Sequence, residues 1–307
     1  MYTIKVSNIN SKMNQPLLHV MIPAYGKSPY LRQTLESVVN KLSPEVLITV
    51  VEDPSEEANL KSLVDEFPRI EYVKNEKRLG VGGNFNRCIE LSKGIFTQIC
   101  GSDDLILDDS SKFLSQNLLS KDIAAVGFDV NIINELNKNV KPLPDLVKRS
   151  LRPKLENEII FKIEDIFKNL MIGDWLYFPN ILWNTEIIKQ IKFDGNFHTA
   201  MDLDIFIKIF NNNKTIAFVS KKTLSYRRHK ESASSKYAKS EGRFTEEFEC
   251  HKNALKIARS KNWKKVQFFA QLALTVRLHA LFQAIVLLPK SPILAIKIFF
   301  KAISPIR

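Results

Sequence analysis

Carboxylate side chains follow two short apolar runs in the first third of the chain. Glu52 and Asp53 follow one run, and Asp103 and Asp104 follow another. Mg²⁺ and Mn²⁺ prefer carboxylate oxygens and usually keep substrate phosphates as further ligands. One or two such carboxylates therefore suffice for a site that binds a metal ion and a diphosphate. Asp103 and Asp104 also suit the cap and turn before a helix near Ser110, so both interpretations stay open.

Two familiar phosphate-binding loops are absent from the sequence. A Walker-type loop needs G-x-x-x-x-G-K-[ST], and no stretch of the chain matches it. A dinucleotide fingerprint needs G-x-G-x-x-G after a strand. Gly80 and Gly82 supply its first half, but Phe85 stands where the third glycine belongs. A nucleotide would have to be held by other means.

The elements that must position these residues alternate between strand and helix. Strands are predicted where short apolar runs are bounded by Pro, Gly, Asp or Asn, at residues 17–22, 46–51, 70–73, 95–100 and 123–128. One helix is predicted at residues 30–42, with Ser28 as its N-cap and Pro29 at its first position. A second is predicted at residues 80–93, ended by Gly94. The alternation predicts an α/β fold with a parallel sheet, whose ligands bind beyond the carboxyl ends of the strands.

The second half of the chain has a weaker pattern. We expect a surface loop at residues 141–153, short strands at 175–179, 181–183, 216–219 and 223–226, and helices at 202–210 and 241–260. The last of these helices has Glu first and Lys or Arg last, which matches the helix dipole.

Positive charge is concentrated near the C-terminus. The chain has 45 Lys and Arg against 33 Asp and Glu, a net charge of +12. Residues 220–307 hold 19 of the basic residues and 5 of the acidic ones. This asymmetry indicates a polyanionic partner such as an anionic membrane, a nucleic acid or a phosphorylated ligand. No nucleic acid is expected, because the basic residues alternate with long aliphatic side chains rather than stacking aromatics.

Residues 263–288 resemble one amphipathic helix. Its polar residues recur every three or four positions and are Lys264, Gln267, Gln271, Thr275, His279 and Gln283. A second apolar segment, residues 293–303, carries Lys297 and Lys301. Basic amphipathic helices of this kind lie in the membrane interface. A helical hairpin packed on the rest of the chain, or on a second copy in a homo-oligomer, is the alternative.

Cysteine usage and the N-terminal sequence bear on the compartment. Cys88, Cys100 and Cys250 are far apart and form no C-x-x-C motif, so a disulfide framework or a structural zinc site is not expected. The first sixteen residues lack the apolar core of a signal peptide. Arg277 and His279 interrupt the longest apolar run, which argues against a spanning helix. We therefore expect a cytoplasmic protein.

The order of several motifs resembles family 2 glycosyltransferases of the GT-A fold. The motifs are HVMIPAY at 19–25, YLRQTLESV at 30–38, VVEDPS at 50–55, NEKRLG at 75–80, GSDDLI at 101–106, FDG at 193–195, AMDLDIFIKI at 200–209 and YRRHKES at 226–232. The resemblance covers about residues 17–235. It implies a Rossmann-like, mostly parallel sheet flanked by helices, and an inverting transfer from a nucleoside-diphosphate sugar.

The resemblance also assigns roles to residues at the strand ends. Tyr25 would stack on the nucleotide base and Asp53 would bond the base edge, with Pro23 and Arg78 in the same donor site. Asp103 would contact the ribose.

The metal and diphosphate site is implied by the same resemblance. Asp103 and Asp104 would hold the Mn²⁺ or Mg²⁺ that bridges the diphosphate. Many relatives have Asp-x-Asp-Asp here, but this chain has Gly101 at the first position. Which of the two carboxylates contacts the metal therefore stays open. His229 could complete the metal site.

Two further cations could bind the diphosphate. Arg227 and Arg228 precede His229, and guanidinium groups bind phosphates well.

Asp202 matches the position of the family's catalytic base. A sugar hydroxyl is a poor nucleophile, so a carboxylate must accept its proton during attack on the anomeric carbon. The family often has Glu before this Asp, where this chain has Met201. Asp204 is the competing candidate, and Asp194 is a more distant one.

The sequence therefore predicts a peripheral enzyme on the inner face of the cell membrane. Residues 1–240 would form the catalytic domain, with a donor-binding half at 17–128 and an acceptor half at 129–235. Residues 241–307 would form a basic helical extension. The acceptor would be a lipid-linked or oligosaccharide glycan contacted by Trp175 and Asn180. The alternative is a non-catalytic module that binds nucleotide sugars or a membrane surface.

Overall fold

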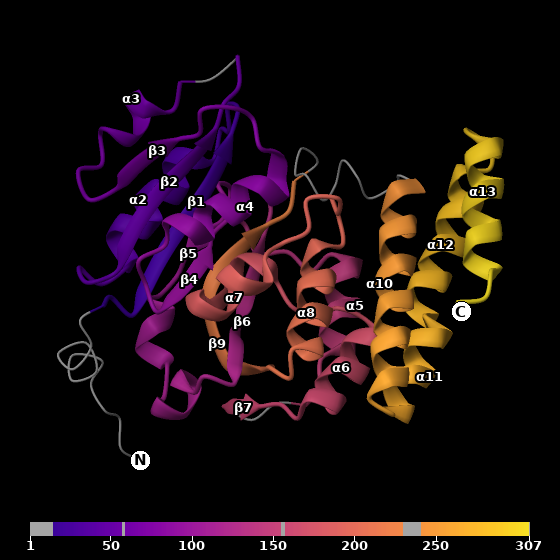
Figure 1. Cartoon of the computed structure of the whole chain (residues 1–307). Coiled ribbons are helices and arrows are strands. Elements are labelled where there is room, and N and C mark those ends of the chain that lie inside the picture. The colour runs from indigo at the N-terminus through magenta and orange to yellow at the C-terminus, as the bar shows by residue number, and fades with distance from the viewer. Residues whose placement is uncertain (1–14, 57–58, 155–156, 230–240, 307) are drawn as a thin grey trace.

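The computed structural model describes residues 15–56, 59–154, 157–229 and 241–306 (Figure 1). One sheet of nine strands forms the centre of this described part, and its strand order is β3-β2-β1-β4-β8-β6-β9-β5, with β7 paired to β9. Its strands are β1 (Leu18–Tyr25), β2 (Leu47–Asp53), β3 (Glu71–Lys74), β4 (Phe96–Ile99), β5 (Leu105–Ile106), β6 (Ile123–Ile133), β7 (Glu158–Ile160), β8 (Ile181–Asn184) and β9 (Thr215–Arg227).

Helices flank this sheet and continue beyond it toward the C-terminus (Figure 1). They are α2 (Leu31–Lys41), α3 (Lys61–Val64), α4 (Gly80–Leu91), α5 (Leu143–Leu151), α6 (Ile163–Ile172), α7 (Thr185–Ile191), α8 (Met201–Asn211), α10 (Glu241–Ser260), α11 (Lys264–Leu272), α12 (Leu274–Leu287) and α13 (Pro292–Ile303). Three short 3₁₀ helices lie at Ser110–Phe113, Gln116–Leu119 and Phe178–Asn180.

The N-terminal half of the sheet is parallel, as predicted. β1 pairs with β2 and β4, and β2 pairs with β3, all in parallel register. Tyr25 lies opposite Asp53 in this register. All five strands predicted before residue 129 are present, which confirms the α/β fold class. The parallel register places the carboxyl ends of β1, β2 and β4 at one edge of the sheet.

The C-terminal half of the sheet mixes both directions. β8 pairs antiparallel with β4 and β6, and it joins the two halves. β6 and β9 are parallel, while β5 pairs antiparallel with β9. Leu105 lies opposite Ser225 in that last pair. This register brings Asp103 and Asp104 beside the end of β9, which carries Arg227.

Two predictions for residues 141–227 were wrong, and two predicted strands are parts of one. The segment at 141–153 is not a loop, because it contains helix α5, whose prolines lie at and before its first turn, where no backbone N–H is needed. Residues 175–179 form no strand, and their end belongs to the 3₁₀ helix Phe178–Asn180. The predicted strands at 216–219 and 223–226 form one continuous strand, β9. Its run of buried residues is interrupted by the exposed Lys221 and Lys222, where the pairing with β6 shifts register.

Two predicted helix ends also differ. α2 begins at Leu31, and Ser28 does not cap it, because the Ser28 hydroxyl instead accepts from the backbone N–H of Tyr30 at 3.3 Å. α4 is followed by Ser92 as its C-cap rather than by Gly94. Gly94 is required for close approach to β1, since a Cβ there would lie 2.7 Å from the backbone nitrogen of His19.

The C-terminal helices pack on the second half of the sheet domain (Figure 1). α10 contacts α8, α11 contacts α6, and α12 pairs with α13. The predicted single helix over 263–288 is broken at Ala273, whose φ of 44° ends α11 in the left-handed region. The Thr275 hydroxyl then donates to the carbonyl of Ile172 and holds the start of α12 against α6. The predicted domain boundary at residue 240 lies outside the described residues.

Candidate active site

Tyr25, Asp53 and Arg78 form one group at the carboxyl edge of the parallel strands. Tyr25 is 52% exposed, and the Arg78 guanidinium carbon lies 4.6 Å from its ring centroid. The Asp53 carboxylate accepts from the backbone N–H groups of Leu79 and Gly80 at 2.7 and 2.9 Å. Asp53 therefore holds the start of α4 beside Arg78. An exposed aromatic ring and a cation at this edge can contact a nucleotide base.

Pro23, the remaining predicted donor residue, lies within β1 opposite Val51. Its side chain is partly buried, so it shapes the backbone that leads to Tyr25. It makes no polar contact with the other donor residues in the described structure.

Asp103 and Asp104 converge over Gly101. A Cβ built on Gly101 would lie 2.8 Å from Asp103 Oδ1 and 2.6 Å from Asp104 Oδ2. Burial, followed by the neighbouring Asp103, raises the pKa of the Asp104 carboxyl well above its usual range. Asp104 Oδ2 is buried and has no hydrogen-bond partner among the described residues. A cation is the kind of group that would satisfy this oxygen.

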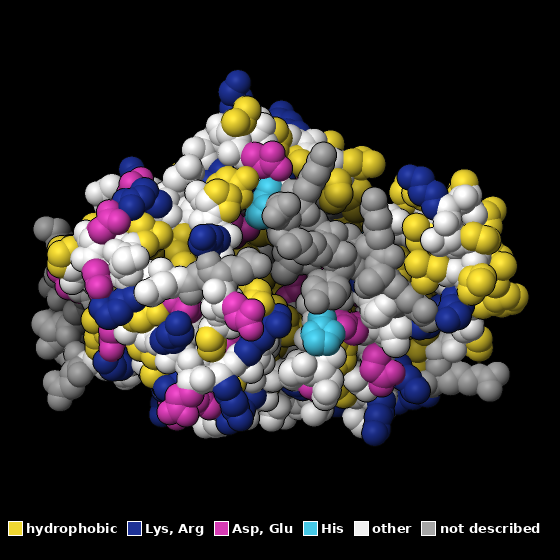
Figure 2. Space-filling view, turned by 90° about the horizontal axis from the view of Figure 1, so that it is seen from above, with side chains coloured by type: hydrophobic (Ala, Val, Ile, Leu, Met, Phe, Trp, Pro, Cys, Tyr) yellow, Lys and Arg dark blue, Asp and Glu magenta, His cyan; other side chains and the backbone are white. Residues whose placement is uncertain are grey.

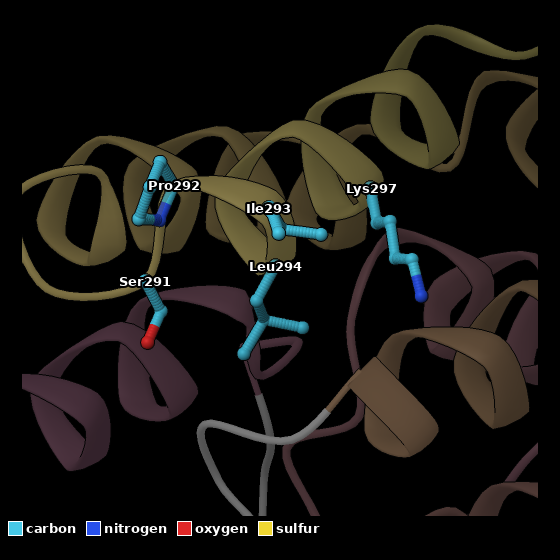
Figure 3. A pocket seen from close by; sticks show the side chains of 5 residues that line it. All are labelled: Ser291, Pro292, Ile293, Leu294 and Lys297. Carbon is cyan, nitrogen blue, oxygen red and sulfur yellow. The ribbon is translucent and has the colours of Figure 1, made fainter.

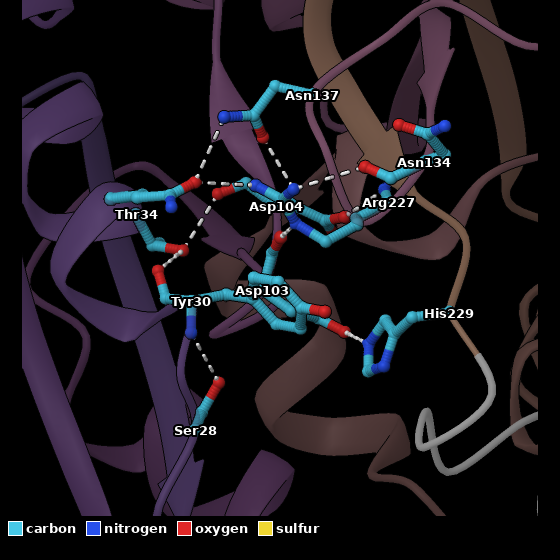
Figure 4. Close-up of polar contacts among 10 residues, drawn as sticks. Ser28, Tyr30, Thr34, Asp103, Asp104, Asn134, Asn137, Arg227 and His229 are labelled. Atoms are coloured by element: carbon cyan, nitrogen blue, oxygen red, sulfur yellow. Dashed lines mark hydrogen bonds and ion pairs between the residues drawn. The ribbon is translucent and has the colours of Figure 1, made fainter.

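Arg227 is buried within protein contacts (Figure 4). Its backbone N–H donates to Asp104 Oδ1 at 2.8 Å, and its Nε donates to the carbonyl of Asp103 at 2.6 Å. The rest of the guanidinium donates to the Asn137 side chain, the Asn134 carbonyl and Gln33, and it lies over the Tyr30 ring. The structure therefore does not present this guanidinium to a diphosphate, because its donors fix the turn that carries Asp103 and Asp104.

Arg228 is also engaged in an ion pair. It binds the buried carboxylate of Asp145 through Nε and Nη2, at 3.1 and 2.8 Å. The Tyr177 hydroxyl donates to the same carboxylate at 2.8 Å. Arg228 thus joins β9 to α5, and the predicted diphosphate contact has no support in this geometry.

His229 lies at the predicted metal site, but on the far side of Asp103. Its Nε2 is 2.6 Å from Asp103 Oδ2, and its ring packs against Tyr30 at 5.0 Å between centroids (Figure 4). Across the described ranges, no three His, Cys, Asp or Glu side chains stand together as a complete metal-binding set. Lys230, which follows His229, lies outside the described residues.

Asp202 lies in the first turn of α8 and pairs with a second acid. Its carboxyl group makes a side-chain hydrogen bond with Asp174 and accepts from the Leu203 N–H at 2.9 Å. Burial and then the charge of Asp174 raise the pKa of Asp202 to about 7, while Lys148 opposes the shift. A carboxyl group with this pKa suits a general base at neutral pH. The sequence analysis missed Asp174, since only the fold brings it to Asp202.

The competing acids have other partners. Asp204 is buried in the same first turn of α8 and forms an ion pair with Lys208 at 2.6 Å. Asp194 lies 3.9 Å from the same Lys208 and bonds the backbone and side chain of Asn196. Burial and the charge of Asp194 raise the pKa of Asp204 too, but Asp204 is bound directly to a cation, Lys208, whereas Asp202 is bonded to another acid.

Glu246 of α10 holds the segment that leads into α8. Its carboxylate accepts from the backbone N–H groups of His198, Thr199 and Ala200 at 3.0, 2.7 and 3.1 Å. Ala200 is the N-cap of α8, which has no side-chain cap of its own. The C-terminal region thus supplies the cap for the helix that carries Asp202, a contact the sequence analysis also missed.

The two predicted acceptor residues belong mainly to the core. Trp175 is buried, its Nε1 donates to Asn169 at 2.5 Å, and its ring packs edge-on against Phe218. Asn180 is buried, donates to the carbonyl of Asp129 at 2.7 Å and accepts from Thr223 at 2.9 Å. Asn180 is thus buried and bonded within the core, whereas Trp175 lines a cavity.

Helix α5 contacts both the group around Asp103 and the group around Asp202. Asp145 binds Arg228, which neighbours His229 and so the group around Asp103. Lys148, one turn further along the same helix, acts on the charge of Asp202. The acids after β4 and at the start of α8 are therefore linked through one element.

Comparisons with known proteins agree with this architecture. The profile of glycosyl transferase family 2 matches residues 19–170. An uncharacterized glycosyltransferase of Methanocaldococcus jannaschii is 23% identical over 225 residues, covering 70% of this chain and 72% of that protein. The chondroitin synthase of Escherichia coli is 23% identical over 198 residues, which cover 63% of this chain and 26% of the synthase.

Solved structures show the same fold. Residues 1–349 of TarS from S. aureus superpose with a TM-score of 0.64 at 16% identity, covering 94% of this chain and 81% of that one. The TarS complex with UDP-GlcNAc gives 0.58 at 14% identity, covering 93% and 90%. GalNAc-T7 with UDP, GalNAc and Mn²⁺ gives 0.54 at 14% identity, covering 82% and 49%. These likenesses establish a GT-A fold.

The GT-A fold and the family model together place the chain among glycosyltransferases. The family that the chain matches is glycosyl transferase family 2, over residues 19–170.

Proposed function

We propose that this protein transfers a sugar from a nucleoside-diphosphate sugar to an acceptor hydroxyl with inversion at the anomeric carbon. The observation that carries the proposal is Asp202, which pairs with Asp174 and has a pKa raised to about 7 by burial and by that second acid. A purely structural carboxyl group gains nothing from such an environment, because ionising it there costs free energy. A base that must exchange a proton near neutral pH needs this environment.

The reaction is a single displacement in which one carboxylate accepts the proton of the acceptor hydroxyl. The acceptor oxygen attacks the anomeric carbon from the face opposite the diphosphate, and its proton passes to Asp202. The bond between the anomeric carbon and the diphosphate oxygen breaks, and the nucleoside diphosphate leaves with that electron pair. Asp174 holds the Asp202 carboxyl in place through the side-chain hydrogen bond. The product has the configuration opposite to that of the donor.

We propose that the donor carries uridine and binds at Tyr25, Asp53 and Arg78. The exposed Tyr25 ring with the Arg78 cation beside it offers one stacking face for a planar base. Asp53 retains acceptor capacity beyond its two backbone contacts and can bond the base edge. Structural neighbours that bind UDP or UDP-GlcNAc support the choice of uridine.

A divalent cation, Mn²⁺ or Mg²⁺, fits the pair of acids at Gly101. The two carboxylates come together in the space beside Gly101 that a Cβ would need, and Asp104 Oδ2 is a buried oxygen without a described partner. Asp103 and Asp104 would hold the ion, and the diphosphate would complete its ligands. When bound, such an ion neutralises negative charge on the departing diphosphate. His229 would act by orienting Asp103, to which it is bonded.

We propose that the protein works on the cytoplasmic face of the cell membrane, on a lipid-linked glycan. The support is an exposed apolar face on α12 and α13, here called the C-terminal apolar face. It is formed by Leu274, Leu278, Phe282, Ile285, Val286, Leu288, Ile293, Ile296, Phe299, Phe300 and Ile303. Figure 2 shows these hydrophobic side chains gathered at one end of the molecule with Lys and Arg beside them.

A hollow of about 340 Å³ opens at the start of α13 within this face. It is lined by Ser291, Pro292, Ile293, Leu294 and Lys297, and Figure 3 shows Leu294 and Lys297 projecting from the same side of the helix. Apolar side chains next to lysines suit the boundary between acyl chains and anionic headgroups.

The described chain has one helical stretch, Lys264–Leu287, that is long and apolar enough to cross a membrane by length and composition. We propose interfacial binding instead. Val266 and Ala270 of α11 are buried in the main core, and the left-handed Ala273 separates α11 from α12. The C-terminal apolar face on α12 and α13 is then the surface proposed to contact lipid.

Vesicle sedimentation tests the membrane proposal. Ile285→Asp on the C-terminal apolar face should abolish binding to vesicles that contain anionic phospholipid. Leu136→Asp is the matched control, because Leu136 is 72% exposed and Ile285 is 71% exposed. Equal binding by both variants would refute the membrane proposal. A dimer that Ile285→Asp dissociates without vesicles present would assign this face to a second copy of the chain instead.

A donor and transfer assay tests the proposed function. Nucleoside diphosphates and their sugars are screened for thermal stabilisation with and without Mn²⁺, because specific binding raises apparent stability by mass action. The stabilising donor is then incubated with membrane lipid acceptors, and the anomeric configuration of the product is read by NMR. Inverted product supports the proposal. Donor binding without any turnover would favour the non-catalytic module.

A further inference from the structure

A cavity of about 270 Å³ lies between α5, β6 and residues 175–177. Aromatic side chains form its buried part, namely Phe128, Trp175, Tyr177 and Phe218. Basic side chains complete its lining, namely Lys141, Lys148, Arg149, Arg152 and Lys222. The volume is near the lower end for ligand pockets and suits one small charged unit rather than a whole oligosaccharide.

The charges of this cavity do not balance. Its two carboxylates are already neutralised, since Asp129 pairs with Arg152 at 3.0 Å and Asp145 pairs with Arg228 at 2.8 Å. Within the described ranges, Lys141, Arg149 and Lys222 form no ion pair, and all three are exposed. These cations face a cavity that offers them no counter-charge.

One of the basic residues connects this cavity to the catalytic acids. The Lys148 ammonium donates to the carbonyl of Leu176 at 2.7 Å, and its charge acts on Asp202. Trp175 lines the cavity and directly follows Asp174, which is bonded to Asp202. A ligand in the cavity therefore lies next to the segment that holds the proposed base.

Another lining residue connects the cavity to the proposed metal acids. Asp145 lines the cavity and binds Arg228, which precedes His229 in the chain. His229 in turn is bonded to Asp103. Contacts of its lining residues thus link the cavity both to the proposed metal acids and to the proposed base.

We propose that this cavity binds a phosphate group of the acceptor substrate. The inference rests on the proposed glycosyl transfer and names the acceptor's chemical class. A phosphate ester carries about −1.5 to −2 charges at neutral pH, whereas a carboxylate carries one, so phosphate matches several uncompensated cations better. Lysine and arginine side chains also bind phosphate oxygens through charge-assisted hydrogen bonds. The aromatic side chains would contact the sugar or polyol that carries the phosphate.

Calorimetric titration of the full chain with glycerol 3-phosphate tests the inference. UDP and Mn²⁺ are kept saturating, so that the donor site is filled and cannot bind the probe. We expect saturable binding of glycerol 3-phosphate and none of neutral glycerol. Lys222→Gln and Arg149→Gln should each weaken binding about tenfold, because each removes one charge-assisted contact.

Lys221→Gln is the matched control. Lys221 is the exposed neighbour of Lys222 in the chain, but it does not line the cavity and lies near the Phe113 ring. It should leave glycerol 3-phosphate binding unchanged. Equal losses in Lys221→Gln and Lys222→Gln would overturn the inference, because they would indicate general surface attraction. Absence of saturable binding in the unmodified chain would overturn it as well.

Competition experiments identify the source of the phosphate. A glycerol phosphate oligomer and a polyisoprenyl phosphate in detergent micelles are each added against glycerol 3-phosphate. Displacement by either supports the inference and names the acceptor type, while displacement by neither contradicts it. UDP binding is measured in the same samples. If UDP fails to bind while glycerol 3-phosphate binds, the proposed function fails and the phosphate cavity stands.

Discussion

The carboxyl groups of Asp174 and Asp202 share a hydrogen bond, although 28 positions separate them in the chain. One precedes the buried Trp175, and the other lies in the first turn of α8. A neighbouring carboxylate disfavours the ionised form of Asp202, because two like charges repel each other. With its pKa raised to about 7, Asp202 takes up and releases a proton near neutral pH, as the proposed transfer requires.

The pair predicts the pH dependence of transfer. Burial and then Asp174 raise the pKa of Asp202 to about 7, and only the ionised form can accept a proton. kcat/KM should therefore rise with pH and level off above about 7. Asp174→Asn removes the like charge and should move this acidic limb down by about one pH unit. Asp194→Asn is the control and should leave the limb in place. If the acidic side of the kcat/KM profile stays at the same pH in Asp174→Asn, Asp202 is excluded as the titrating group.

The raised pKa of Asp202 predicts that Asp202→Asn, which should lose activity, gains folding stability at alkaline pH. An aspartate ionises near pH 3.9 in the unfolded chain, and Asp202 ionises near 7 in the folded one. Folding stability is therefore lost as the pH rises from about 4 to 7. Asp202→Asn should unfold like the unmodified protein near pH 4 and be more stable at pH 8, by about 1–2 kcal/mol. Denaturant titrations at both pH values measure this, and destabilisation at pH 8 would contradict it.

Glu246 predicts a coupling between α10 and the proposed base. Burial alone would raise the pKa of Glu246, but hydrogen bonds from Thr199, His198 and Ala200 outweigh it and lower the pKa. The stabilisation is therefore present above the unfolded pKa near 4.3 and is lost at lower pH. Glu246→Gln should lower stability at pH 7 by about 1–2 kcal/mol, as for loss of a helix cap.

Glu246→Gln should also lower kcat more than it raises KM, since the cap fixes α8 rather than the substrates. Glu247→Gln is the matched control, because Glu247 pairs with Arg243 on the same helix and touches no part of α8 in the contacts described. Similar kcat values in the two variants would show that the cap has no effect on the reaction.

The acids at Gly101 predict a metal requirement. Removal of divalent ions with EDTA should abolish transfer, and Mn²⁺ should restore it. Asp104→Asn should weaken Mn²⁺ binding, measured by electron paramagnetic resonance with UDP present, by about tenfold or more. Gly101→Ala should weaken it too, since its Cβ would lie 2.6 Å from Asp104 Oδ2. Asp108→Asn, at an exposed carboxylate paired with Lys112, is the control. Full transfer in EDTA would refute the metal proposal.

The donor half of the fold was predictable because its signals are local. β1, β2 and β4 are short buried runs, and acidic residues stand at the end of β2 and soon after β4 in the sequence itself. Asp53 and Tyr25 are opposite each other simply because β1 and β2 are adjacent and parallel. No long-range contact had to be guessed to place them at one edge.

The remainder of the site depends on contacts that the sequence does not encode locally. Arg227 looked like a diphosphate ligand, but Gln33 and Asn137, both far away in the chain, bury it. Prolines and mixed charge made the segment of helix α5 resemble a loop in the sequence. This helix carries Asp145 and Lys148, whose contacts link the acids after β4 to Asp202. Asp174 has no periodic or motif signal, so its pairing with Asp202 emerges only from the fold.

The most direct test of the central claim compares donor binding and sugar transfer in Asp202→Asn. Loss of a general base lowers the rate by about 10²–10⁴-fold. We predict that this variant binds the donor and Mn²⁺ as tightly as the unmodified protein and transfers sugar at least about a hundredfold more slowly. Transfer at the unmodified rate with intact donor binding would contradict the assignment of Asp202 as the base of an inverting glycosyltransferase.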